Sequence, residues 1–365
     1  MKKSEGKIGS REVFVLVAYM ISVELSDMTP TFLFEEGKTA TWMMPLIAGI
    51  VIIPPFLFLS ALLNKYQDKG LVHIVYDLMG KYIGFIINFI LFLIMLLATA
   101  INSRDYVDII QTLYLPTTPR IAIYILLMVA VWFIASRGLE VIGRTAWFAF
   151  PIHTVVLGIF VILALGRVDL SFLFPFWGSG FLETLKVSVQ NSVIVDDILF
   201  LPALFPYVRS HKDFKTPALL GLLLCMVEMA GSFAIYIATF DYPSVNQILF
   251  PFHQTLSMIQ LGRFFINIES VYFAFWVIAS VIRYTIYLYL STSIFAFTLR
   301  IKEFEPLLLP MTGLSIMIGM IPGNPVEIIM VFRKNIIVEN TWIFLISLPI
   351  TLWILYKIRR ERKSN

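Results

Sequence analysis

Two clusters of polar and acidic residues interrupt apolar stretches of this sequence, and they are its best candidates for binding a ligand. The first cluster, inside segment 11–34, comprises Glu24, Ser26, Asp27, Thr29 and Pro30. The second, inside segment 181–207, comprises Gln190, Asn191, Ser192, Asp196, Asp197 and Pro202. Asp, Ser and Thr side chains compete for backbone hydrogen bonds, and proline cannot donate one. Each cluster therefore predicts a broken helix.

The two clusters lie at matching depths. Residues 24–27 and 194–197 each begin about 13 positions into their segment, which corresponds to about 20 Å at the rise of a helix. That depth is near the middle of a bilayer. Discontinuous helices at corresponding positions of two halves indicate a transporter-type binding site. The alternative is a polar interhelical network, or proline kinks, with no ligand.

From these clusters we predict the ligand-binding residues Ser26, Asp27, Thr29, Asn191, Ser192 and Asp196. Half-helix N-termini would bind a carboxylate, whereas an acid or unwound carbonyls would bind an ammonium group or another cation. Secondary or ion-coupling candidates are Glu24, Asp197, Glu228 and Arg283. Glu228 and Arg283 fall near the middle of their segments, where each needs a partner. Arg283 could pair with Glu228 or with an acid of the sixth segment.

A third charged group falls at the end of segment 81–113, where the sequence places Arg104, Asp105 and Asp108. Charges at the end of a membrane segment usually face water, so we expect a solvated rim there. An extracellular gate is the alternative.

The elements that must position these residues are membrane helices. Apolar residues make up 59% of the 365 residues and charged residues 14%, against about 25% charged in soluble domains. This composition excludes a soluble, disordered or disulfide-scaffold protein, and Cys225 is the single cysteine. Spans of about 20 apolar residues must be helical here, because the alternating strands of a barrel are absent. We predict ten of them, at 11–34, 41–63, 81–113, 119–136, 141–165, 181–207, 216–240, 267–299, 305–322 and 337–358.

The predicted fold is an all-α polytopic membrane protein with one transmembrane domain, 1–365. A five-plus-five inverted repeat would divide it into about 11–165 and about 181–358, with broken first and sixth helices. Amphipathic loops at 71–80 and 244–263 follow the second and seventh segments on opposite faces, as such a repeat requires. Ordinary surface-lying connectors are the alternative explanation of these loops.

The basic residues predict that both termini are cytoplasmic. With ten spans, 19 of the 28 Lys and Arg residues fall on the inner side, as the positive-inside rule requires. The net charge of +4 is therefore a signal of topology and not of nucleic-acid binding. Residues 359–365 form a basic cytoplasmic tail, and Lys357 to Lys363 would contact anionic lipid.

The sequence predicts no catalytic residue, cofactor or metal site. It has no Gly-rich phosphate loop, no nucleophile elbow and no histidine pair at ligand spacing. We therefore expect a protein that is not an enzyme.

Several short motifs, in order and from Gly9 to Lys363, resemble the spore germination receptor B subunits. These form the spore-permease branch of the amino acid–polyamine–organocation transporter superfamily. The motifs are Gly80-Lys81-Tyr82-Ile83-Gly84, Arg137-Gly138-Leu139-Glu140-Val141, Pro175-Phe176-Trp177-Gly178-Ser179-Gly180, Leu199-Phe200-Leu201-Pro202 and Trp276-Val277-Ile278.

The resemblance implies a ten-helix inverted-repeat fold in the inner membrane of a bacterial endospore, or in the cell membrane. It implies partnership with an A subunit and a lipoprotein C subunit, and a small-molecule germinant such as an amino acid as ligand. Two alternatives remain open. One is a proton- or sodium-coupled symporter of amino acids or cations, and the other is a structural or ion-conducting receptor subunit.

The chain departs from the family pattern at both predicted breaks. Members often have glycines in the first break, where this chain has Val23, Glu24, Leu25, Ser26 and Asp27. Ile194 likewise replaces a glycine before the acid of the sixth segment. Bulkier and acidic residues predict a smaller pocket that repels a carboxylate. A different germinant, a cationic ligand and a subunit that binds no small molecule all fit this departure.

Overall fold

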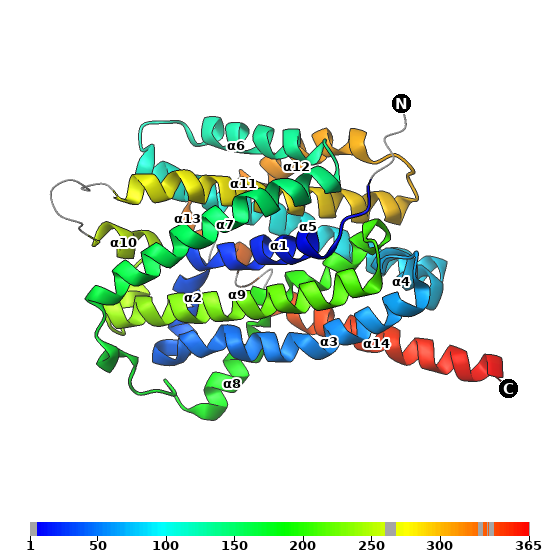
Figure 1. Ribbon diagram of the computed structural model, residues 1–365, viewed down its shortest axis with the longest axis horizontal. Coiled ribbons are helices and arrows are strands. Elements are labelled where there is room, and N and C mark those ends of the chain that lie inside the picture. Colours follow the sequence, from blue (N-terminus) through cyan, green and yellow to red (C-terminus); the bar gives the residue numbers. More distant parts are fainter. Residues whose placement is uncertain (1–5, 260–267, 328–330, 334, 336–338, 365) are drawn as a thin grey trace.

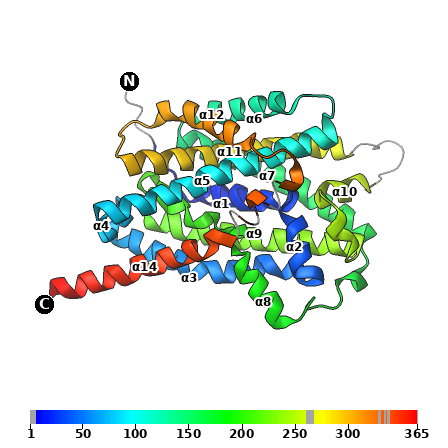
Figure 2. The same cartoon turned by 180° about the vertical axis from the view of Figure 1, so that it is seen from behind.

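The computed structural model describes residues 6–259, 268–327, 331–333, 335 and 339–364. Within these residues the regular structure is helical, and the one β-type contact is an isolated bridge between Ile8 and Val208. Long helices run side by side along the long axis of the molecule, and the start of α1 lies toward the same end as the end of α14 (Figure 1, and Figure 2 from behind).

The helices follow the predicted segments closely. The first half contains α1 (Ser10–Ser22), η1 (Val23–Ser26), α2 (Thr29–Gly37), η2 (Lys38–Met43), α3 (Met44–Tyr66), α4 (Leu71–Met79), α5 (Lys81–Ile109), η3 (Ile110–Tyr114), α6 (Arg120–Ala135), α7 (Leu139–Ala164), η4 (Leu165–Arg167) and η5 (Leu170–Leu173). The second half contains α8 (Phe181–Gln190), η6 (Ser192–Leu199), η7 (Leu201–Tyr207), α9 (His211–Phe240), η8 (Ser244–Gln247), α10 (Pro251–Ser257), α11 (Ile268–Leu299), η9 (Glu305–Leu307), α12 (Leu308–Gly319), α13 (Pro325–Glu327) and α14 (Glu339–Ser364).

The described part of the chain has six helices that are long and apolar enough to cross a membrane. A seventh span results if α8 and the η6–η7 helix, bent by 41°, count as one. α6 and the helix Glu305–Gly319 are apolar but shorter. Each predicted segment contains a helix, whereas the count of ten spans and the inverted repeat stay predictions. The loop 71–80 forms α4, and 244–259 contains η8 and α10, while 260–263 lies outside the described residues.

The predicted helix breaks are confirmed at both positions. α1 ends at Ser22, and the chain continues through η1 into Asp27, whose backbone is extended (φ −92°, ψ −158°). The Asp27 carboxylate accepts the backbone N–H of Thr29 at 2.7 Å, which caps the start of α2. In the second half α8 ends at Gln190, and Asn191 donates its side-chain amide to the Val187 carbonyl. Asp27 thus satisfies a backbone donor at the break, whereas the Asn191 amide adds to the bond of 2.9 Å that the Asn191 backbone N–H donates to the Val187 carbonyl.

α1 occupies the centre of the bundle, which places the first break deep inside it. α1 packs against α9, α7 and α11, and η6 contacts both α1 and α3. In Figure 1, α1 runs between α7 and α9 in the middle of the bundle. The outer helices α6 and α7 instead expose large apolar side chains, such as Leu126 and Phe148. Those surfaces suit contact with lipid, so the polar breaks are shielded from it.

Gly319, the last residue of α12, lies where this helix packs closely on α5 and α6. A Cβ there would lie 2.8 Å from the Ala100 carbonyl oxygen and would also meet the Tyr124 hydroxyl. We expect Gly319→Ala to destabilise the fold by about 1–3 kcal/mol through overpacking, measured as a lower thermal midpoint in detergent. Gly313→Ala in the same helix is the control, because nothing lies within 4 Å of its Cβ position. Equal midpoints for the two variants would contradict the packing argument.

Candidate functional site

A buried network of charges joins the first break to helices from distant parts of the chain. Arg283 of α11 lies 2.5 Å from Glu24 Oε1 and 3.5 Å from Asp27 Oδ2. Arg333 lies 2.9 Å from Asp27 Oδ2 and 3.0 Å from Asp105 Oδ2. All five side chains are almost fully removed from solvent. The two guanidinium groups therefore neutralise carboxylates that could not remain charged alone at this depth.

Arg333 was not among the residues singled out from the sequence. It precedes α14, where segment 337–358 was expected to begin, yet its guanidinium reaches the break in the first helix. The sequence does carry a signal, because Arg333 and Lys334 interrupt a run that is apolar on both sides. Extending the tenth segment backward would have placed this arginine inside the membrane.

The second break contributes Asp196 and Asp197 to the same region. The Tyr287 hydroxyl donates a hydrogen bond to Asp197 Oδ2 and accepts one from Arg283 Nη2 at 3.0 Å. Asp197 is thus connected to the charge network through a tyrosine. Asp196 Oδ2 is buried and has no hydrogen-bond partner among the described residues, and the same holds for Thr29 Oγ1 and Ser192 Oγ.

A small cavity of about 40 Å³ lies between the two breaks. Since one water needs about 10–15 Å³ of such volume, the cavity has room for roughly three waters and not for an amino acid. Apolar side chains close much of its wall, including Phe32 and Phe200. The polar residues that line it are Glu24, Thr29, Asn102, Asp196, Asp197, Tyr287 and Arg333.

The remaining predicted site residues lie around this cavity without lining it. Ser26 Oγ accepts a hydrogen bond from Trp276 Nε1 at 2.9 Å and donates to the Val23 carbonyl at 2.7 Å. Asn191 donates its amide to Glu36 Oε2 at 2.7 Å. Ser26 and Asn191 therefore support the shape of the breaks, whereas Thr29 and Asp196 face the cavity.

The predicted partners of Arg283 are wrong. Glu228 accepts a hydrogen bond from Ser22 Oγ at 2.5 Å and forms no ion pair with Arg283. The acids of the sixth segment do not pair with Arg283 directly either, because its carboxylate partners are Glu24 and Asp27. Depth along a helix does not specify which face points inward, and α11 turns Arg283 toward α1.

The expectation of a solvated rim at residues 104–108 is also wrong. Arg104, Asp105 and Asp108 are buried, with at most 1% of each residue exposed. Arg104 Nε lies 3.0 Å from Asp108 Oδ1, and its Nη1 donates to the Gly319 carbonyl at 2.7 Å. The reason is that α5 is covered along this length by α11 and α12, so the end of the apolar stretch is not the surface of the protein.

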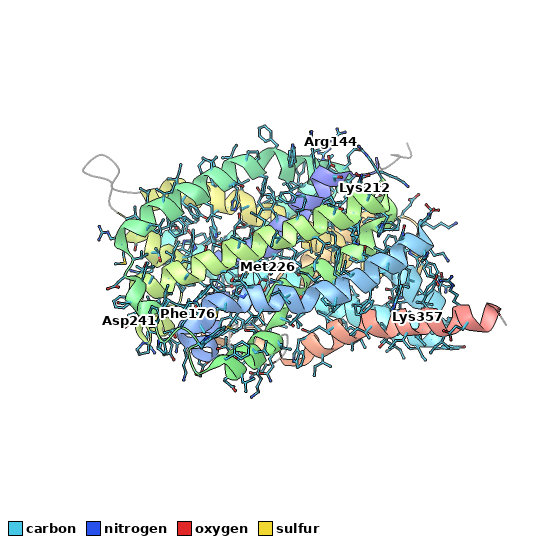
Figure 3. All side chains as sticks on the ribbon, turned by 60° about the horizontal axis from the view of Figure 1, so that its bottom comes forward. Arg144, Phe176, Lys212, Met226, Asp241 and Lys357 are labelled. Carbon is cyan, nitrogen blue, oxygen red and sulfur yellow. The ribbon has the colours of Figure 1, made fainter. Side chains whose placement is uncertain are left out.

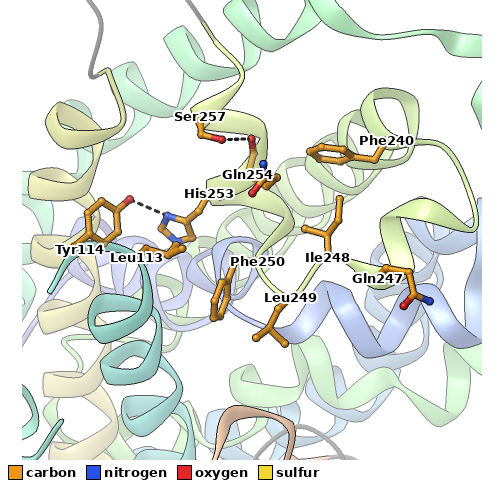
Figure 4. A pocket seen from close by; sticks show the side chains of 10 residues that line it. All are labelled: Leu113, Tyr114, Phe240, Gln247, Ile248, Leu249, Phe250, His253, Gln254 and Ser257. Carbon is orange, nitrogen blue, oxygen red and sulfur yellow. Dashed lines mark hydrogen bonds between the residues drawn. The ribbon is translucent and has the colours of Figure 1, made fainter. Parts of the chain in front are cut away.

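A larger cavity of about 710 Å³ lies beside α10, at the end of the bundle opposite the chain termini (Figure 4). His253 lines it and shares a hydrogen bond of 3.1 Å with the Tyr114 hydroxyl. Burial lowers the pKa of His253 to about 3, so the ring is neutral at physiological pH. The other side of this ring packs edge-on against Trp276, whose own ring stacks on Tyr106 at 4.3 Å.

This aromatic layer extends from the large cavity, which His253 lines, to the first break. Trp276 is hydrogen-bonded to Ser26 in the first break, and Thr31 of α2 donates to the Leu249 carbonyl at 3.0 Å in the loop before α10. The large cavity is thus linked to the central one through α2 and through the His253–Trp276–Tyr106 stack.

Long apolar helices around two buried helix breaks define a multi-pass membrane protein with a transporter fold. The fold is similar to that of MhsT in complex with L-phenylalanine, with a TM-score of 0.65, 16% identity and coverage of 95% of this chain and 87% of that one. A Na+-coupled sialic acid symporter has a TM-score of 0.57 at 12% identity, covering 96% of this chain and 78% of its own. At these identities the likeness concerns the fold.

The family of the chain follows from its sequence relatives. A family model described as spore germination protein matches residues 7–328, and the chain belongs to this family. Spore germination protein KB of Bacillus subtilis (strain 168) is 21% identical over 321 residues, covering 86% of this chain and 84% of the relative. Spore germination protein XB of Bacillus anthracis is 23% identical over 274 residues, covering 74% and 75%. The resemblance drawn from the short motifs is confirmed.

Proposed function

We propose that this chain is the germinant-sensing membrane subunit of a spore germination receptor. A small molecule would bind between η1 and η6, where the two helix breaks meet. The observation that carries the proposal is that Asp196 Oδ2 and Thr29 Oγ1 are buried at the central cavity and form no hydrogen bond with any residue that the structure describes. Buried polar atoms without partners are rare in folded proteins, so a ligand is expected to satisfy them.

The charges around the cavity favour a ligand that carries a cationic group. Two guanidinium groups, of Arg283 and Arg333, lie among the five carboxylates of Glu24, Asp27, Asp105, Asp196 and Asp197. Both arginines are already engaged by carboxylates, and no basic side chain among the described residues lies within ion-pair distance of Asp196. An ammonium or guanidinium group would pair with Asp196, whereas the carboxylate of a simple amino acid would be repelled.

Binding requires the site to expand, because the central cavity is smaller than any amino acid. The larger cavity beside α10 offers a route of entry from the end opposite the termini (Figure 1). Passage would move the Trp276 ring and, through its hydrogen bond to Ser26, the break itself. Such coupling would let occupancy of the site alter the packing of α1 and α11 and so signal to partner subunits.

The cellular setting of the proposal follows from family membership and topology. We infer that the chain lies in the spore inner membrane, with both termini cytoplasmic, in a complex with an A subunit and a lipoprotein C subunit. Relatives named spore germination proteins and the basic residues grouped at one side of the predicted topology support this setting. In this role the chain is not an enzyme and needs no cofactor.

The proposal is tested by Asp196→Asn in spores that depend on this chain. A thermal-shift screen of the purified protein first identifies a ligand, because a molecule that binds only the native state raises the melting temperature. We expect Asp196→Asn to raise the germinant concentration for half-maximal germination at least about tenfold, the equivalent of one lost charged contact. Asp68→Asn, on an exposed turn, is the control. An unchanged dose response at normal protein level would remove Asp196 from the site.

A symporter is the second candidate function, favoured by the same unpaired acid. An aspartate without a cationic partner could carry a coupling proton or sodium ion, and the fold is shared with a Na+-coupled symporter. Uptake by the chain alone in proteoliposomes, dependent on a proton or sodium gradient, would favour this function. If the chain takes up none of the amino acids and organic cations tested, the germinant-sensing function is favoured over the symporter.

A further inference from the structure

A groove of about 550 Å³ opens on the outside of the bundle, at the end where α1 and α9 begin. It is separate from both cavities described above. Its basic rim consists of Arg11 and Lys212, each the second residue of its helix, and its walls include Phe14, Trp147, Phe150 and Leu220. Figure 3 shows Lys212 and Arg144 at this end of the molecule, with Asp241 and Phe176 at the opposite end.

The chemistry of the groove changes along the helices in the order of a lipid leaflet. Leu220 lies eight residues after Lys212 on α9, which is about 12 Å further along the helix. Leu220 is 54% exposed and Trp147 38% exposed, so both present apolar surface to whatever surrounds the protein. A charged rim with an indole beside Arg11, and an aliphatic wall further along α9, match headgroup, interface and acyl chain.

The rim carries a net positive charge, because Arg11 and Lys212 outnumber Asp213, the one acid of the lining. In the part of the chain that the structure describes, neither Arg11 nor Lys212 lies within ion-pair distance of a carboxylate. Arg11 instead lies over the Trp147 ring at 5.5 Å. The one acid of the lining, Asp213, already accepts hydrogen bonds from Ser10 and Ser210, both at 2.6 Å. An anion at the rim would therefore meet two cations and one carboxylate, whose oxygens the two serine hydroxyls already occupy.

We propose that this groove binds one anionic phospholipid. Its phosphate group lies between Arg11 and Lys212, and an acyl chain lies along Phe150 and Leu220. A lipid is favoured over a protein partner because the groove combines an anion-binding rim with an apolar wall at the depths where every membrane supplies both. The lipid holds together the first turns of α1 and α9, at the opposite end of α1 from the break.

The test uses the purified full-length protein and phosphatidylglycerol, with phosphatidylcholine of the same acyl chains as the zwitterionic comparison. Native mass spectrometry counts retained lipids, and the thermal midpoint reports stabilisation. Arg11→Gln/Lys212→Gln removes the two positive charges of the rim. The control Lys65→Gln/Lys215→Gln also removes two positive charges. Lys65 is exposed near the end of α3, Lys215 is half-exposed near the start of α9, and neither lines the groove.

We expect one retained phosphatidylglycerol on the wild type and the control, bound at least about tenfold more weakly by the rim variant. Four outcomes would overturn the proposal. The first is that both double variants bind phosphatidylglycerol equally weakly, and the second is that the wild type retains phosphatidylcholine as well as phosphatidylglycerol. The third is that free glycerol 1-phosphate displaces phosphatidylglycerol as effectively as the intact lipid does. The fourth is that the lipid is lost when the A subunit is bound. The last would identify the groove as a protein interface. None of these outcomes depends on germinant binding, so they leave the function of the central cavity unaffected.

Discussion

Arg283→Met is expected to destabilise the protein by about 3–5 kcal/mol, because it leaves buried carboxylates without their counter-ion. Arg283 is fully buried, and its guanidinium lies 2.5 Å from Glu24 and 3.5 Å from Asp27. Without it, the cation that remains beside Glu24 in the described part of the chain is Arg333, at 3.7 Å. The effect is measured as a large drop in the thermal midpoint at one fixed scan rate, compared with Arg300→Met, which changes an exposed arginine just after the same helix.

A second substitution separates loss of charge pairing from loss of packing. Arg283→Met/Glu24→Gln removes one carboxylate together with the guanidinium, so the double variant should be more stable than Arg283→Met alone. Methionine keeps much of the apolar volume of the arginine stem, which limits the cavity left behind. A double variant less stable than the single one would show that Glu24 is not the group that Arg283 neutralises.

Arg333→Gln is expected to open the central cavity to water-soluble reagents. Arg333 connects Asp27 at the first break with Asp105 on α5, at 2.9 and 3.0 Å, and its own backbone precedes α14. Its removal leaves Asp105 without its ion-pair partner and leaves Asp27 with Arg283 alone, at 3.5 Å, so two carboxylates on different elements face each other with less compensating charge. Their repulsion should favour states in which α2 and α5 move apart, and the breaks become accessible.

Thiol labelling measures this opening. Cys225 is the single cysteine, so Cys225→Ser gives a background in which Ala98→Cys, on the cavity wall, is the one reactive position. We expect Arg333→Gln to raise the rate of labelling by a membrane-impermeant maleimide at least about tenfold, the equivalent of 1.4 kcal/mol. Arg333→Lys should be intermediate, since lysine keeps the charge but cannot bridge two carboxylates with a planar fork.

Arg120→Gln is the matched control for the labelling experiment. Arg120 lies 2.7 Å from Asp108 near the same end of α5, yet it does not contact either break. Its substitution should leave the labelling rate at Ala98→Cys unchanged. An equal increase in both variants would indicate general loosening of the fold, and no increase in Arg333→Gln at unchanged stability would show that Arg333 does not keep the site closed.

The helices and the two breaks could be predicted from the sequence because both depend on local chemistry. A run of apolar residues long enough for a bilayer must satisfy its own backbone, so it forms a helix near the expected bounds, as in 81–113 and the helix Lys81–Tyr114. Side chains such as Asp27 and Asn191 bond to backbone groups within a few residues of themselves. Such contacts need no knowledge of the rest of the fold.

Which residues meet across the bundle was decided by the tertiary structure alone. Arg283 and Glu24 are 259 positions apart, and nothing in either segment indicates that their side chains share a face. The sequence does not show which helices lie beside α5. Arg104, Asp105 and Asp108 were therefore predicted at a solvated rim, although α11 and α12 bury them. Arg333 was missed for a different reason, because the predicted tenth segment began at residue 337, after this arginine. Hydropathy and spacing report how deep a residue lies along its own helix, whereas pairing depends on how that helix is rotated and on what covers it.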